Sequence, residues 1–353
     1  MAIESAPVDL GGYTLREDAS LRGRNTLRVN ARAALLAEVR DANALTKLLE
    51  WPALHDMRTL VLGEGSNMLF ADDFRGLVIL LKTRGIAIVD EDGHSARVRV
   101  AAGEHWNDVV RWTLARGLCG LENLSLIPGT AGAAPVQNIG AYGVELETFV
   151  HTVETFDLRE HRTLAFTQSE CAFAYRDSRF KHELDRWLIT SLELDLPKQR
   201  EPILDYAGVR EELAAMGIDG KPGPAQVAEA VVRLRTRKLP DPALLPNAGS
   251  FFKNPILPRA QAEALQREHP TVPLWPMDAT HAKLSAAWLI ETSGLKGMRE
   301  GDAGISERHA LVLVNHGNAT GAQLWALAQR VRMSVHARFG VMLEPEPRVI
   351  GSV

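Results

Sequence analysis

The chain has 353 residues, which predicts two or three domains, and its composition of 46% hydrophobic and 24% charged residues is typical of a soluble globular protein. A net charge of -4 argues against nucleic acid as a partner, although a local basic pocket for one anionic small molecule stays open. Two cysteines are too few for a disulfide framework or a thiolate metal site.

The N-terminal sequence lacks the basic segment and apolar core of a signal peptide. No apolar run reaches the roughly 18 residues that a membrane helix needs. We therefore expect a cytoplasmic protein with no membrane partner.

Hydrophobic spacing in the first 198 residues predicts many short strands and few helices, which is an α+β pattern. Apolar residues recur at helical spacing in two segments, 33–50 and 104–116. Strands are expected over 59–62, 77–81, 97–100, 152–157 and 186–196.

Beyond Leu196 a segment rich in proline and charge is typical of a linker. The C-terminal part is expected to contain helices over 224–238, 259–268 and 283–292, and strands over 310–315 and 341–350. A last helix is expected after Thr320, with Gln323 placed for a capping box.

The stretch 127–145 combines four glycines, four alanines and two prolines with no positive charge. Glycine permits close backbone approach, so such a run suits main-chain N–H groups wrapped around an anion such as a pyrophosphate. Gln137 and Asn138 add donors and acceptors that suit the edge of a polar ring. The alternative is a tight buried turn without a ligand.

The segment 63–69 follows the predicted strand 59–62 and begins Gly-Glu-Gly. The dinucleotide fingerprint needs a third glycine, where this chain has Met68, and a helix opening there. A second apolar strand follows instead, so we reject that interpretation. The loop can still present N–H groups to a phosphate.

Ser250 lies in the stretch 247–255 and directly follows a glycine. It can be a nucleophile, a proton donor or a turn residue. A hydrolase elbow would require a glycine at position 252, which is Phe252, and a nearby histidine, which is not evident. Acyl transfer is therefore not expected.

Arg176, in the segment 175–181, can grip a carboxylate with its planar fork or lie solvated on the surface. Glu344 and Glu346 would share a face if their segment is a strand, or they form a polar edge ended by prolines. The 11 histidines are scattered and no acidic loop matches a calcium pattern, so no metal site is expected.

Five stretches occur together in this order: 62–69, 127–145, 175–181, 249–255 and 343–346. On these motifs the chain resembles the UDP-N-acetylenolpyruvoylglucosamine reductase (UDP-N-acetylmuramate dehydrogenase) family, from about residue 20 to residue 350. The spacer between Pro255 and Lys283 resembles the family's first type, which keeps an extra loop that covers the substrate.

The resemblance implies an α+β FAD-binding fold of the vanillyl-alcohol-oxidase (PCMH) type, with FAD held between two subdomains and a third domain over a UDP-sugar. It divides the chain into 1–70 joined by the C-terminal strand 341–353, then 71–198, a connecting segment 199–239, and a substrate-binding domain 240–340. It implies NADPH-dependent reduction of UDP-N-acetylglucosamine enolpyruvate to UDP-N-acetylmuramate through FAD, in peptidoglycan synthesis. Small molecules would be the only partners of a monomer.

The resemblance also implies roles for individual residues. Arg176 would hold the substrate carboxylate and stabilise the enolate-like charge, with help from Glu346, most usefully if protonated. Ser250 would be the general acid that protonates the second carbon, assisted by Lys253 or a water chain. The implied FAD contacts are Gly63, Gly65, Ser66, Asn67, Pro128, Gly129, Thr130, Gln137, Asn138, Gly140 and Gly143.

Tyr206, Lys238 and Asn254 resemble the family's contacts to the substrate diphosphate and sugar. Trp275 stands where the covering loop usually has a tyrosine, so stacking is retained but a phenol hydrogen bond is not. Ala133 and Ala134 stand where a glycine is common, so the backbone there cannot rely on a positive φ.

Two other functions stay open at this point. One is a different flavin oxidoreductase of the same fold, which would act on a sugar or alcohol and use oxygen as its acceptor. The other is a nucleotide-sugar-binding protein without catalysis, in which replacing Ser250 would leave function intact.

Overall fold

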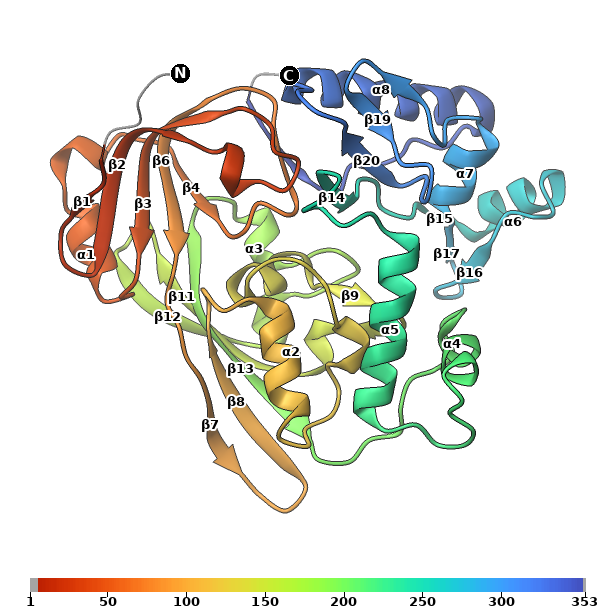
Figure 1. Ribbon diagram of the computed structural model, residues 1–353, viewed down its shortest axis with the longest axis horizontal. Helices are drawn as coiled ribbons and strands as arrows, with labels where there is room; N and C mark the ends of the chain where they lie inside the picture. Colours follow the sequence, from red (N-terminus) through yellow and green to blue (C-terminus); the bar gives the residue numbers. More distant parts are fainter. Residues whose placement is uncertain (1–5, 352–353) are drawn as a thin grey trace. The chain divides into compact units, whose positions relative to one another are not determined.

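The computed structural model describes residues 6–351, which form two compact units (Figure 1). The first unit comprises the described residues up to 19, then 33–64 and 75–237. The second comprises 20–32, 65–74 and the described residues from 238 onward. Within residues 6–351, none of the helices has the length and apolar character needed to cross a bilayer.

One sheet of the first unit has five strands, which lie side by side in Figure 1. Strands β4 and β6 pair in parallel, with Leu60 opposite Val78, and both of these side chains are fully buried. The strand order is β1 (Val8–Asp9), β2 (Tyr13–Ser20), β3 (Arg32–Val39), β6 (Phe74–Leu81) and β4 (Thr59–Leu62).

The helix expected over 33–50 is wrong for its first half. Residues 32–39 form strand β3, and only α1 (Ala44–Leu49) is helical. Strand β3 lies between β2 and β6, and its Leu36, Ala37 and Val39 are buried. Sheet pairing and burial therefore prevail over the helix preference of a segment rich in alanine and leucine.

A second sheet of the first unit is antiparallel, and its long central strand alternates between buried and more exposed residues, as the sequence predicts, only over residues 192–196. Helix α2 (Trp106–Leu114) lies within the expected 104–116 and buries Trp106, whose indole N–H donates to the carbonyl oxygen of Leu124 at 3.0 Å. The strand order is β12 (Arg162–Thr167), β11 (Val150–Asp157), β13 (Trp187–Pro197), β8 (Ser95–Ala101) and β7 (Ile86–Glu91).

The other elements of the first unit are short, except for one helix. The helix expected over 224–238 is confirmed as α5 (Pro224–Lys238), which reaches just past the end of this unit. The remaining helices are α3 (Arg179–His182) and α4 (Val209–Ala215), and β9 (Gly140–Ala141) pairs with β10 (Val144–Glu145). The 3₁₀ helices are η2 (Pro52–Leu54), η3 (Glu122–Leu124), η4 (Ala131–Gln137), η5 (Leu146–Thr148) and η6 (Ser169–Cys171).

The second unit contains a hydrophobic core that is formed mainly by its last hundred residues. One sheet has the order β14 (Asn247–Ser250), β20 (Val312–Asn315), β19 (Ala303–Ile305) and β18 (Arg299–Glu300). A smaller sheet has the order β15 (Ile256–Pro258), β17 (His281–Leu284) and β16 (Leu274–Pro276). The helical elements are η1 (Arg22–Arg24), α6 (Arg259–Glu268), α7 (Ala286–Thr292) and α8 (Gly321–Phe339).

The predicted capping box of the last helix is confirmed. Thr320 accepts from the backbone N–H of Gln323, and the Gln323 side chain accepts from the backbone N–H of Thr320. The helix over 259–268 is also confirmed, as α6. The expected helix over 283–292 begins only at Ala286, since β17 includes residues 283 and 284.

The expected terminal strand over 341–350 shortens to β21 (Arg348–Ile350), which pairs in parallel with β5 (Met68–Phe70). The C-terminal end of the described chain thereby joins the segment around residue 69 within the second unit. Pro345 and Pro347 precede β21 and cannot donate ladder hydrogen bonds, which limits its length.

Candidate functional site

The start of one predicted cofactor loop, Gly63 and Glu64, meets the glycine-rich stretch within the first unit. Gly63, at the end of β4, lies against Thr130 so closely that a Cβ there would be 2.9 Å from the Thr130 hydroxyl. The neighbouring Glu64 carboxylate accepts from the backbone N–H of Gly129 at 2.9 Å. Two segments 65 residues apart in sequence are therefore in direct contact.

The glycines of these loops are needed largely because protein atoms fill the space of a side chain. A Cβ at Gly132 would lie 2.6 Å from the Cβ of Ala102, and one at Gly65 would lie 2.3 Å from the Arg24 carbonyl oxygen. Gly129 and Gly143 have φ of +117° and +84°, which disfavours other residues. Packing and dihedral angles thus account for glycines that sequence reasoning attributes to a ligand.

Asn138 ends η4 in the left-handed region, with φ of +44°, and is fully buried. Its side-chain NH₂ donates to Glu145 at 3.1 Å and to the carbonyl oxygen of Ala174 at 3.2 Å. Its side-chain oxygen accepts from the backbone N–H of Glu147 at 3.0 Å. These bonds use the amide group to fix the loop.

Arg176 also has a positive φ, +56°, which is uncommon outside glycine. Its Nη2 donates to the carbonyl oxygen of Gly140 at 2.5 Å, and its own carbonyl oxygen accepts from Lys181 Nζ at 3.0 Å. Strained backbone of this kind persists where surrounding contacts impose it, and such residues cluster at functional sites. The guanidinium is therefore held beside the glycine-rich stretch.

A second arginine, which sequence reasoning missed, lies near Arg176. The pKa of Arg235 is lowered, first by burial and also by the positive charge of Arg176, while Tyr142 opposes the shift. Its Nε is buried without a hydrogen-bond partner among the described residues. Tyr142 contacts Tyr206 edge to face, with ring centroids 5.0 Å apart. Tyr206 and Arg235 follow Arg176 by 30 and 59 residues, so no local motif links them to it.

In the second unit, the segments of Ser250 and Glu346 run side by side. Ser250 pairs with Val312 at the end of β14. The backbone N–H of Glu346 donates to the carbonyl oxygen of Phe251 at 2.9 Å, and Phe252 forms an antiparallel bridge with Pro345. Two of the three predicted catalytic residues thus lie on paired segments, although 96 residues separate them in sequence and Glu346 itself precedes strand β21.

Asn67 lies beside Glu346 as well. Its side-chain NH₂ donates to the carbonyl oxygen of Glu346 at 3.4 Å, and its carbonyl oxygen accepts from the backbone N–H of Arg348 at 3.1 Å. A predicted cofactor loop therefore contacts the predicted catalytic glutamate's own segment.

Lys253 and Asn254 already have partners inside the second unit. Lys253 Nζ is 2.5 Å from the carboxylate of Glu344, and its backbone N–H donates to the Glu344 carbonyl oxygen at 3.0 Å. The Asn254 side-chain oxygen accepts from the backbone N–H of Ala286 at 3.0 Å. Lys253 therefore connects the segment after Ser250 with the segment before Glu346.

The pKa of His309 is lowered, first by burial and then by the positive charges of Lys238 and Lys296. This places a neutral histidine near the predicted substrate contact Lys238.

Trp275 pairs with Lys283 in the small sheet, and 44% of its surface is exposed. Lys238 is exposed as well, so both of these predicted substrate contacts reach solvent.

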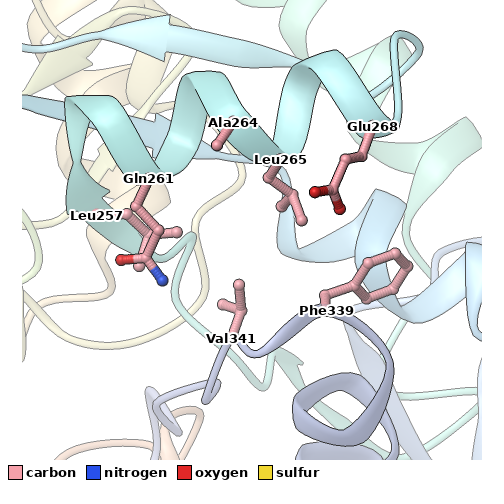
Figure 2. Close-up of a pocket in the computed structure, with 7 residues that line it drawn as sticks. All are labelled: Leu257, Gln261, Ala264, Leu265, Glu268, Phe339 and Val341. Carbon is pink, nitrogen blue, oxygen red and sulfur yellow. The ribbon is translucent and has the colours of Figure 1, made fainter.

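Residues 6–351 contain no group of three or more His, Cys, Asp or Glu side chains able to hold a metal ion. A pocket of about 190 Å³ lies between α6 and the end of α8, where Phe339 and Val341 face α6 (Figure 2). None of the predicted site residues lines it. Its lining residues are Leu257, Gln261, Ala264, Leu265, Glu268, Phe339 and Val341.

Comparisons with known proteins agree on one family. Residues 241–350 match the C-terminal domain of UDP-N-acetylenolpyruvoylglucosamine reductase, and residues 33–160 match an FAD binding domain. A UDP-N-acetylenolpyruvoylglucosamine reductase of Xylella fastidiosa (strain M12) is 52% identical over 349 residues, which cover 99% of both chains. One of Xanthomonas euvesicatoria pv. vesicatoria (strain 85-10) is 51% identical over 342 residues, 97% of each chain.

A solved structure is similar across almost the whole chain. The UDP-N-acetylenolpyruvylglucosamine reductase (MurB) of Thermus caldophilus aligns with a TM-score of 0.63 at 26% identity. The alignment covers 94% of this chain and 98% of that one. Together with the FAD binding domain match, this confirms the expected α+β FAD-binding fold.

Proposed function

The chain belongs to the UDP-N-acetylenolpyruvoylglucosamine reductase family, and from this premise we propose how its own residues carry the family's reaction. It is an FAD-dependent oxidoreductase that uses NADPH to reduce UDP-N-acetylglucosamine enolpyruvate to UDP-N-acetylmuramate, a step of peptidoglycan synthesis. The expected activity and cofactors are confirmed. The individual residue roles below are proposals.

The loop at 63–67 and the stretch 128–143 would hold FAD through backbone N–H groups and small side chains. The small residues fit such a cofactor because Gly63 lets the two segments approach closely, within 2.9 Å of the Thr130 hydroxyl for a Cβ there. Asn138 would act indirectly, since its amide group fixes the loop. When bound, FAD supplies the hydride chemistry, and the protein supplies orientation and charge stabilisation.

Arg176 would hold the substrate carboxylate and stabilise the negative charge that develops beside it during reduction. The hydrogen bond from its Nη2 to the Gly140 carbonyl oxygen fixes the position of the guanidinium before the substrate binds. Arg235 adds a second positive charge nearby, which favours binding of an anion. Preorganised charge of this kind needs no rearrangement at the moment of reaction.

Ser250 would protonate the second carbon, and Glu346 would stabilise the enol form of the intermediate. The observation that carries this assignment is the pairing of their two segments through Phe251 and Glu346. A serine hydroxyl is a weak acid, so it serves only where the accepting carbon is strongly basic. Reduction of an enolpyruvyl group meets that condition because its intermediate is carbanionic.

Tyr206, Lys238, Asn254 and Trp275 would contact the diphosphate and sugar of the substrate. Tyr206 in the first unit and Trp275 in the second are each partly exposed, at 50% and 44%, as a ligand contact requires. Asn254 has only its NH₂ group to offer, since its oxygen caps α7. The protein would act on small molecules as a monomer in the cytoplasm, and size-exclusion chromatography with light scattering tests the monomer.

The two half-reactions test the assignment of Arg176. NADPH should bleach the flavin absorbance of the parent protein and of Arg176→Lys at similar rates, because the arginine serves the other substrate. UDP-N-acetylglucosamine enolpyruvate should then restore the oxidised spectrum on the order of 100-fold more slowly in the variant. The matched control is Arg75→Lys, at an exposed position of the first unit.

Equal reoxidation of Arg176→Lys and the parent would remove Arg176 from the mechanism. Rapid reoxidation by air, with no effect of the enolpyruvyl substrate, would instead favour an oxidase of the same fold.

A further inference from the structure

We propose that Glu64 and His105 form a brace that holds the start of one cofactor loop, at Gly63 and Glu64, against the glycine-rich stretch and thereby sets the affinity for FAD. Neither residue belongs to the expected FAD contacts, and neither is assigned a role in the reduction. The proposal concerns binding of the confirmed cofactor, so it is independent of the roles proposed for Arg176, Ser250 and Glu346.

The first half of the brace is the Glu64 carboxylate. Its Oε2 accepts from the backbone N–H of Gly129 at 2.9 Å, and its Oε1 contacts Nδ1 of His105. A carboxylate that accepts from a backbone N–H makes a charge-assisted bond, which is stronger than a neutral one. Glu64 directly follows Gly63, so this bond holds the end of β4 against the start of the glycine-rich stretch.

The second half is His105, at the start of α2. Backbone bonds on both sides of it hold this segment against the glycine-rich stretch: Trp106 N–H donates to the Gly129 carbonyl oxygen at 2.9 Å, and Ala131 N–H donates to that of Glu104 at 2.8 Å. His105 itself forms a bridge with Thr130. Its ring therefore projects from a segment already fixed to one loop and reaches the carboxylate of the other.

Arg84 determines which nitrogen of the His105 imidazole carries the proton. Its Nη2 lies 3.4 Å from Nε2 of His105, and an arginine can only donate, so Nε2 accepts and Nδ1 carries the hydrogen. Nδ1–H then donates to Glu64. Arg84 is itself held through Nη1 to the Glu104 carboxylate at 3.2 Å, which also accepts from Gly85 N–H at 2.6 Å.

The brace also determines what the Gly129 N–H can do. That N–H is directed at a protein carboxylate, so it is not available to a phosphate. Gly129 would then serve the cofactor through its shape, with φ of +117°, and the neighbouring groups would make the direct contacts. Loss of the brace would let the two loops separate and would raise the entropy lost when FAD orders them.

The test measures FAD affinity and does not depend on turnover. Apoprotein variants Glu64→Ala and His105→Ala are titrated with FAD while flavin fluorescence is followed. Each should bind FAD on the order of 10-fold more weakly, since a charge-assisted hydrogen bond is lost. Controls of the same chemistry are Glu50→Ala and His55→Ala, both exposed in the first unit and outside the brace, and these should match the parent.

The double variant separates a brace from two independent effects. If Glu64 and His105 act through one connection, removing both should weaken FAD binding about as much as removing one. Effects that multiply would overturn the proposal, and so would single variants that bind FAD within twofold of the parent.

Amide exchange in the apoprotein gives a readout that needs no cofactor. The Gly129 N–H should exchange faster in Glu64→Ala than in the parent and in Glu50→Ala, because its acceptor is gone. Rescue by Glu64→Gln should be partial, since the amide keeps one oxygen to accept from Gly129, but the NH₂ that replaces the other oxygen cannot accept from Nδ1–H of His105. Unchanged exchange at Gly129 would overturn the proposal even if FAD affinity falls.

Discussion

The guanidinium of Arg176 rests on the backbone of Gly140, where Nη2 donates to the carbonyl oxygen at 2.5 Å. A Cβ at position 140 would lie 2.9 Å from Nη1 of the same arginine and 2.9 Å from Cγ of Glu145. The glycine thus makes room for the arginine, and the arginine fixes the hairpin of β9 and β10. Two of the recognised sequence motifs meet in this one contact.

The first prediction concerns Gly140→Ala. The added methyl group should displace the guanidinium and slow reoxidation of the flavin by the enolpyruvyl substrate by roughly 10- to 100-fold, since small misplacements of positioned groups are costly. Reduction by NADPH should change little. Stopped-flow absorbance of the two half-reactions measures both rates. Gly93→Ala is the control, since a Cβ there meets no atom within 4 Å. Equal substrate rates in both variants would refute the prediction.

The second prediction concerns Ser250→Ala. If the hydroxyl delivers the proton, the substrate half-reaction should fall by about 10²- to 10⁴-fold while reduction by NADPH stays normal. The same stopped-flow measurement applies, with Ser334→Ala on α8 as the control. If the variant turns over like the parent, Ser250 is not the proton donor, and the alternative interpretation of Ser250 as an ordinary turn residue is favoured.

Sequence patterns predicted the elements whose signals are local. The helices over 224–238 and 259–268 and the capping box of Thr320 depend on neighbouring residues, and all three are confirmed. The pattern failed at residues 33–39, where the apolar spacing of a strand that buries the adjacent residues Leu36 and Ala37 also fits a helix. Pairing with β2 and β6 decided the outcome, and no local pattern reports such pairing.

The residues of the candidate site likewise fall into those that local sequence predicts and those that it does not. Its motifs were visible as unusual local sequences, and the resemblance gave their roles. Arg235, His309 and the pair Glu64–His105 were not found, because each is an ordinary residue whose surroundings come from distant segments. The sequence also could not show why glycine is needed at positions 63 and 132, because the atoms that exclude a side chain there belong to Thr130 and Ala102.

The third prediction concerns Gly321, the first residue of α8. Alanine at the start of a helix normally stabilises it, but a Cβ here would lie 1.7 Å from the carbonyl oxygen of Phe70. Since the neighbour is backbone, Gly321→Ala should lower the free energy of unfolding by roughly 3 kcal/mol. Thermal unfolding measures this, and Gly23→Ala, which meets no atom within 4 Å, is the control. Equal midpoints for the two variants would contradict the contact.

The fourth prediction concerns the pH dependence of stability through His309. Burial, and then Lys238 and Lys296, lower the pKa of this histidine below its usual value of 6.5, although Glu291 opposes them. Its Nδ1 accepts from the backbone N–H of Leu311 at 3.3 Å, which requires the neutral ring. The unfolded chain therefore takes up a proton at a pH where the folded chain does not. The contribution of His309 to stability is complete above about pH 6.5 and declines as the pH falls below it.

Replacing His309 by glutamine should remove this part of the pH dependence. Gln has no proton to gain, and its side-chain oxygen can still accept a hydrogen bond. Thermal midpoints measured from about pH 8 to pH 5 should therefore fall less steeply for His309→Gln than for the parent, with the curves diverging below the ordinary histidine pKa. His336→Gln, at an exposed position of α8, should follow the parent curve. Parallel curves for His309→Gln and the parent would mean that the half-buried imidazole does take up its proton in the folded chain, against the effect of Lys238 and Lys296.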